Sequence, residues 1–173
     1  MNLLKDYIIP IEGLKDGLYH YNYHINKSFT DQFNYQDIVD IYAQAKVTLK
    51  KVNTMLDFSI IINGKILAEC DRCLDEFYMD IAFENNFTVK LDDNIMDDDE
   101  EMIYIPSQSK EFDIAPYIFE TIVFAIPMKK IHPFNKIGES LCNPEFISKL
   151  NRYTVSESVT NDPRWDKLKE LLN

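Results

Sequence analysis

The chain has 173 residues, 46% hydrophobic and 13% aromatic, which suffices for one core, and no apolar run approaches the length of a membrane span. Its net charge of −11 would repel a phosphate backbone at long range, which argues against nucleic-acid binding through bulk charge. Three cysteines and a start without signal-peptide features lead us to expect a cytoplasmic protein rather than an exported, disulfide-bonded one.

The first ninety residues alternate between apolar and polar side chains, which is typical of half-buried β-strands. In the first such run, His20 and His24 share one face but stand too far apart to bind one metal together. A second strand is predicted around residues 45–50, and Asn63-Gly64 predicts a hairpin turn after it. We expect these strands to form an antiparallel meander.

A C-x₂-C pair, Cys70 and Cys73, lies between two of these strands. The spacing lets two sulfurs converge on one metal, and tetrahedral zinc needs two further donors, for which Cys142 and His132 or a carboxylate are candidates. Two other interpretations stay open. The pair could be a redox dithiol, although such motifs usually open a helix, or the cysteines could be small buried hydrophobes in a turn.

An acidic block covers residues 92–101 and includes Asp97, Asp98 and Asp99. Such blocks usually stay solvated because neighbouring charges repel each other. The block predicts a charged surface loop. A functional alternative is a docking face for a basic partner, such as a ribosomal protein, or a mimic of RNA.

A helix is predicted at residues 113–126, with Asp113 as its N-cap, Pro116 in its first turn and Pro127 as its stop. We expect one apolar stripe to pack on the sheet, formed by Ile114, Ile118, Ile122 and Ile126. A second surface, either covered or facing a partner, consists of Phe119, Val123 and Phe124. A local basic patch follows at Lys129, Lys130, His132 and Lys136.

The last part of the chain is less regular. Residues 127–161 are poorly patterned, and we expect an extended tail that orders on binding. Asp162 and Pro163 then predict the start of a short amphipathic helix that carries Trp165. The predicted organisation is one core domain over residues 1–126, followed by a segment over 127–173 that belongs to it or forms a tail.

Catalytic motifs are absent from the sequence. It contains no glycine-rich phosphate loop, no G-x-S-x-G elbow and no H-E-x-x-H, and its acidic residues have no evident base or metal partner. We therefore expect a protein that is not an enzyme.

The order of features resembles the YceD family, the bacterial large ribosomal RNA subunit accumulation proteins. The resemblance runs over residues 10–172, through ECDRCLDEF, a helix that ends in AIPM, a later cysteine and a final DPRW. It implies a cytoplasmic, non-enzymatic role in the accumulation, processing or early assembly of large-subunit ribosomal RNA. The implied partners are the RNA precursor or a basic large-subunit ribosomal protein, with no membrane and no small-molecule substrate.

One departure from the family concerns the metal. Many members carry a second cysteine cluster, CPxCG, but this chain reads SLCNPEF, with Cys142 present and Glu145 where the next cysteine would fall. Either a Cys₃ site recruits Glu145 or His132, or the cysteines only pack. The metal candidates are Cys70, Cys73, Cys142 and His132, and the resemblance assigns no catalytic residue. The candidates for partner binding are Arg72, Glu120, Pro127, Lys129, Lys130, Arg164, Trp165, Asp97, Asp98 and Asp99.

The expected fold is α+β, a twisted antiparallel sheet, open or barrel-like, packed with the apolar helix and the short C-terminal amphipathic helix. Two functional alternatives to the biogenesis factor remain. One is an RNA-contacting module that uses Arg72, Lys129, Lys130 and Lys136, and the other is a thiol redox protein.

Overall fold

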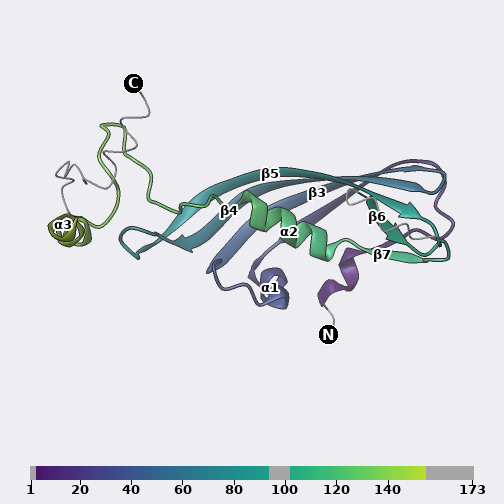
Figure 1. The fold of residues 1–173 in the computed structure, drawn as a ribbon, viewed down its shortest axis with the longest axis horizontal. Coiled ribbons are helices and arrows are strands. Elements are labelled where there is room, and N and C mark those ends of the chain that lie inside the picture. Colours follow the sequence, from purple (N-terminus) through teal and green to yellow (C-terminus); the bar gives the residue numbers. More distant parts are fainter. Residues whose placement is uncertain (1–2, 94–101, 155–173) are drawn as a thin grey trace, which may run out of the picture.

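The computed structural model describes residues 3–93 and 102–154 (Figure 1). The elements in chain order are η1 (Leu3–Tyr7), β1 (Ile8–Pro10), β2 (Gly17–Ile25), α1 (Lys27–Thr30), η2 (Asp31–Phe33), β3 (Asp40–Val52), β4 (Met55–Glu69), β5 (Glu76–Leu91), β6 (Met102–Ile105), β7 (Glu111–Asp113), α2 (Ala115–Ala125) and α3 (Pro144–Tyr153). The fold is α+β, as expected from the sequence.

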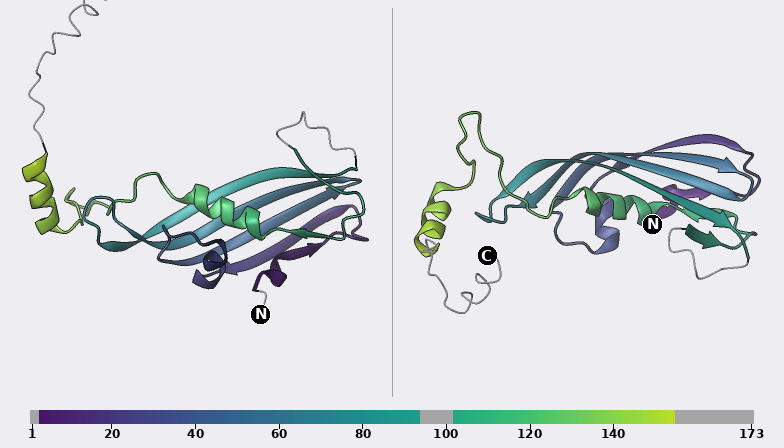
Figure 2. Two further views of the ribbon diagram at one scale, coloured as in Figure 1. Left: turned by 60° about the horizontal axis from the view of Figure 1, so that its bottom comes forward. Right: turned by 45° about the horizontal axis from the view of Figure 1, so that its top comes forward.

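A twisted sheet of five strands, in the order β2-β3-β4-β5-β6, dominates the structure (Figures 1 and 2). The first four strands are antiparallel neighbours, whereas β6 pairs with β5 in parallel. Among the described residues β2 and β6 do not pair with each other, so the sheet is open and the barrel-like alternative is wrong. A separate two-stranded sheet joins β1 to β7.

The alternation read from the sequence decides which face of the sheet is buried. On β3, Ala45, Val47 and Leu49 are fully buried, while Lys46 and Lys50 at alternate positions are exposed. Burying one such aliphatic side chain stabilises the fold by about 1.5–3 kcal/mol. Because side chains alternate along a strand, one face of the sheet becomes the core and the other faces solvent.

The hairpin predicted at Asn63-Gly64 is wrong. Both residues lie inside β4, where Gly64 pairs with Ala43 on one side and Ile81 on the other. The β3–β4 turn comes earlier, at Asn53, which adopts a left-handed φ of 53°. The alternation of β4 runs through the Asn-Gly pair, and Gly64 occupies an inward position where an added Cβ would overlap Ala43.

The predicted helix is present as α2, which lies on the same face of the sheet as α1 (Figures 1 and 2). It begins at Ala115 and ends before Pro127. The N-cap is Ile114, so the N-cap predicted at Asp113 is wrong by one residue; Asp113 Oδ1 still accepts from the Ala115 N–H at 2.9 Å. The stripe that faces the sheet is buried, with Ile118 and Ile122 fully covered. Among the described residues, no helix is both long and apolar enough to span a membrane.

The expected second surface of α2 is largely occupied within the molecule. Phe119 stacks on Phe33 with ring centroids 4.2 Å apart and an interplanar angle of 5°. Phe124 is 55% exposed and lies 6.0 Å from the Phe83 ring. Of the apolar side chains expected there, Phe124 is the one most open to a partner.

The segment after α2 is more regular than the sequence suggested. Residues 127–143 form a loop, and α3 follows with Asn143 as its N-cap and Pro144 in its first turn. This helix was missed in the stretch interpreted as poorly patterned. It lies beyond the end of the sheet where β4 passes into β5 (Figures 1 and 2). The amphipathic helix predicted from Asp162 onward is outside the described residues.

Candidate metal centre

The C-x₂-C pair sits in a tight turn between β4 and β5. The Cys70 N–H donates to the Asp75 carbonyl at 3.0 Å, and the Leu74 N–H donates to the Cys70 carbonyl at 2.9 Å. Leu74 closes the turn with a left-handed φ of 61°. The two long strands on either side hold this turn, residues 70–75, at one end of the sheet.

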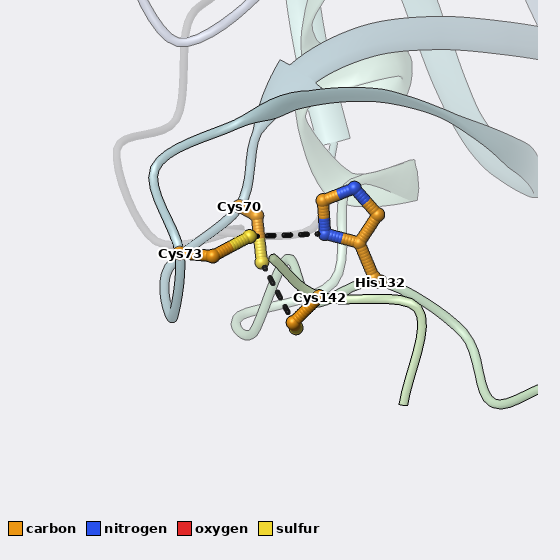
Figure 3. Close-up of side chains that lie close together, drawn as sticks. All are labelled: Cys70, Cys73, His132 and Cys142. Atoms are coloured by element: carbon orange, nitrogen blue, oxygen red, sulfur yellow. Dashed lines mark hydrogen bonds between the residues drawn. The ribbon is translucent and has the colours of Figure 1, made fainter. Parts of the chain in front are cut away.

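The loop at residues 127–143 is bound to this turn by two hydrogen bonds between Asp71 and Lys130. The Asp71 N–H donates to the Lys130 carbonyl at 2.7 Å, and the Lys130 N–H donates to Asp71 Oδ2 at 2.6 Å. His132 follows two residues later and points at the cysteines (Figure 3). We call the turn 70–75 and the loop 127–143 together the tip.

Cys142 reaches the same point from the far end of the loop. A short antiparallel bridge between Phe134 and Ser140 folds the loop back on itself, and the Cys142 N–H donates to Ser140 Oγ at 3.2 Å. The cap of α3 begins at the next residue, Asn143, whose side chain accepts from the Glu145 N–H. The position of Cys142 is therefore coupled to the start of α3.

Four potential ligand atoms converge at the tip, from Cys70, Cys73, His132 and Cys142 (Figure 3). All four lie within 4.8 Å of one another. Cys70 Sγ is 3.9 Å from Cys142 Sγ, and Cys73 Sγ is 3.4 Å from His132 Nδ1. A tetrahedral zinc would require about 3.8 Å between two sulfurs and about 3.6 Å between a sulfur and a nitrogen.

The cluster is closed to solvent. Cys70, Cys73 and Cys142 are 0%, 1% and 5% exposed, and His132 is half-buried. The Phe77 ring lies 4.5 Å from the His132 ring, centroid to centroid. Apolar side chains complete the surroundings, namely Met79, Ile131 and Ile147. The three sulfurs are therefore shielded from water.

The pKa values of the two thiols of the turn shift in opposite directions. Burial raises the pKa of the Cys70 thiol, but hydrogen bonds to its thiolate outweigh burial and lower the pKa to about 6. The donors are the backbone N–H groups of Arg72, Cys73 and His132 and the His132 ring. Burial raises the pKa of the Cys73 thiol, and the neighbouring Cys70 adds to the shift.

The structure shows which of the side chains considered from the sequence lie together. Among the described residues, His132 joins the three cysteines, whereas Glu145 is exposed on the first turn of α3 and is not part of the cluster. His20 and His24 lie on the exposed face of β2, as expected. The contact between Asp71 and Lys130, which orients the loop, was missed because no sequence signal links residues 59 positions apart.

The candidates for partner binding fall into three groups. Arg72 and Lys130 lie at the tip and are half-buried, and Lys130 Nζ is 3.9 Å from Asp37 Oδ2. Lys129 and Lys136 on the same loop are exposed. Glu120 and Pro127 are exposed on and just after α2. The remaining candidates, Asp97, Asp98, Asp99, Arg164 and Trp165, lie outside the described residues.

A protein-family model with the description "Large ribosomal RNA subunit accumulation protein YceD" matches residues 58–172, about two thirds of the chain. The chain belongs to the YceD family. This confirms the resemblance read from the sequence over the matched residues, which include all four members of the cluster. The YceD description names a role in the accumulation of large-subunit ribosomal RNA. No curated protein and no solved structure matches the chain.

Proposed function

We propose that this member of the YceD family promotes the processing or early assembly of large-subunit ribosomal RNA by binding a precursor, without catalysing a reaction. The observation that carries the proposal is the family match over residues 58–172. The proposed function belongs to the cytoplasm, where reducing conditions keep cysteines as thiols. The odd number of cysteines, three, agrees with that compartment better than with a framework of disulfides.

A binding role agrees with the chemistry of the tip better than a redox role does. A catalytic dithiol needs a low thiol pKa and access for its substrate. The pKa of about 6 at Cys70 meets the first requirement, but Cys70 and Cys73 are 0% and 1% exposed and fail the second. Burial argues against the redox role, because a thiol exchange reaction requires direct contact between two sulfurs.

The partner we propose is the precursor of the large subunit, contacted through the tip. Arg72 from the turn and Lys129 from the loop lie on the two segments that the Asp71–Lys130 contacts hold together. Local cations of this kind can pair with RNA phosphates even though the net charge is −11. The excess of acidic side chains supports a second candidate partner, a basic ribosomal protein bound elsewhere on the surface.

Depletion of the protein tests the function. The ratio of large- to small-subunit ribosomal RNA should fall, and precursors with unprocessed ends should accumulate if the step is processing. An unchanged ratio with normal precursor ends would refute the proposed function.

Charge reversal of exposed lysines tests whether the tip is the surface that contacts the precursor. Lys129→Glu with Lys136→Glu should weaken salt-sensitive cosedimentation with large-subunit precursors and fail to restore the RNA ratio. The matched control reverses two exposed lysines on the solvent face of β3, Lys46→Glu with Lys50→Glu, and should behave like the wild type. If both pairs behave like the wild type, the tip is not the contact surface.

A further inference from the structure

We propose that Cys70, Cys73, His132 and Cys142 bind one zinc ion, and that this ion is structural and joins the tip to the sheet. The inference goes beyond the proposed function, because it concerns what holds the molecule together rather than what it binds.

The donor set and its dimensions fit zinc. Three cysteine sulfurs and one imidazole nitrogen form a common tetrahedral zinc environment. The distances of 3.9 Å between two sulfurs and 3.4 Å between Cys73 Sγ and His132 Nδ1 are close to those of a zinc tetrahedron, about 3.8 Å and 3.6 Å. All four atoms lie within 4.8 Å of one another, so the most distant pair needs to close by at most about 1 Å to reach tetrahedral separations.

The surroundings fit a structural rather than a catalytic ion. Four protein ligands saturate a tetrahedral zinc, so no position remains for water or substrate. Zinc with three thiolates and a neutral imidazole carries a net charge of −1. Backbone N–H groups in the turn point at Cys70 Sγ and stabilise this charge.

The competing interpretations explain less of the cluster. A disulfide between Cys70 and Cys142 would leave Cys73 and His132 without a common role, and the 3.9 Å between the two sulfurs exceeds the length of an S–S bond, about 2.05 Å. Simple apolar packing does not account for an imidazole whose ring nitrogen lies against Cys73 Sγ at 3.4 Å. Zinc uses all four side chains at once.

Zinc binding would attach residues 127–153 to the sheet. The loop and α3 lie beyond the end of the sheet, and Ile147 of α3 packs against the cysteine cluster. Ligands from the turn and from the loop would make the ion a cross-link between segments about sixty positions apart in sequence. We therefore assign the C-terminal segment to the same domain as the sheet, rather than to a tail.

Metal analysis of the full-length protein, purified under reducing conditions, tests the site. We expect one zinc per chain in the wild type and none in Cys142→Ser. His132→Ala should bind zinc more than about a hundredfold more weakly, since even the loss of a residue that only supports a ligand costs 10–100-fold. His132→Cys should retain the ion as a Cys₄ site.

Glu145→Ala is the matched control, because Glu145 is the exposed alternative ligand on α3. It should keep one zinc per chain. Far-ultraviolet circular dichroism identifies variants that fail to fold. If a variant fails to fold, cobalt added to the wild-type protein provides an independent readout, because tetrahedral thiolate coordination gives visible absorption bands.

Three results would overturn the proposal: wild-type protein with intact thiols and no zinc, loss of zinc in Glu145→Ala but not in His132→Ala, or iron in place of zinc. None of them depends on ribosomal RNA. Zinc binding can therefore be absent while the RNA phenotype is observed, and zinc can be bound while the RNA phenotype is absent.

Discussion

Replacing Gly64 by alanine is expected to destabilise the protein strongly, although the change adds one methyl group. Gly64 lies in the central strand β4, paired with β3 on one side and β5 on the other. A Cβ at this position would overlap the backbone of Ala43 and the carbonyl oxygen of Tyr42. Backbone atoms cannot rotate away as a flexible side chain can, so the two strands would have to separate.

The cost follows from two effects. Forcing an extra carbon into a packed interior typically costs about 1–3 kcal/mol. Weakening one ladder hydrogen bond between β3 and β4 adds about 1 kcal/mol. We expect a loss of about 2–4 kcal/mol, a large part of the roughly 5–15 kcal/mol by which a domain is usually stable. For a chain of this size the melting temperature should fall by roughly 4–16 °C.

Urea unfolding and thermal melts measure the effect, with Asn63→Ala as the matched control. Asn63 is exposed on the same strand, so its replacement should change stability by less than about 0.5 kcal/mol. If Asn63-Gly64 formed a hairpin turn, both variants would lose stability through the left-handed positions of that turn. A Gly64→Ala variant as stable as the wild type would show that β3 does not approach β4 this closely.

Two further predictions concern the core and the tyrosines. Ile118→Ala removes a fully buried side chain between α2 and the sheet, so the free energy of unfolding measured in urea should fall by about 2–5 kcal/mol. The exposed control, Glu120→Ala, should lower it by less than about 0.5 kcal/mol. Equal losses would contradict the packing of α2. Burial raises the pKa of Tyr23 from 10.0 to about 12. The contribution of Tyr23 to the free energy of unfolding should therefore be fully present below pH 10 and be lost between pH 10 and 12, because its hydroxyl loses the proton first in the unfolded chain. Tyr23→Phe should flatten that decline, measured as urea midpoints across this pH range, and an unchanged slope would assign the decline to other groups.

Local patterning explains why most of the sheet and α2 could be predicted. The alternation at Ala45, Val47 and Leu49 depends only on the strand period, and the tertiary structure retains it. The limits of α2 follow from Asp113 and Pro127, which act on the backbone next to them. Such signals are readable because cause and effect lie within a few residues.

The errors arose where local signals competed. Asn63-Gly64 is a strong turn signal, but the alternation of Ile60, Ile62 and Ile66 continues through it, and pairing on both sides outweighed the turn preference. In α3 the start signal was present, since Asn143 precedes a proline in the first turn. Helix α3 was missed in the sequence because the polar residues of 127–161 obscure its helical pattern.

The sequence by itself determined that Cys70 and Cys73 could bind one ion, since the C-x₂-C spacing alone brings two sulfurs together. It narrowed the other ligands to Cys142 with His132 or a carboxylate. Only the tertiary structure places His132 beside the three cysteines, because its position depends on the contacts between Asp71 and Lys130 across 59 residues of chain. Contacts of that separation depend on the register of the β4–β5 pair and the path of the chain after α2, and neither is encoded in the residues around His132.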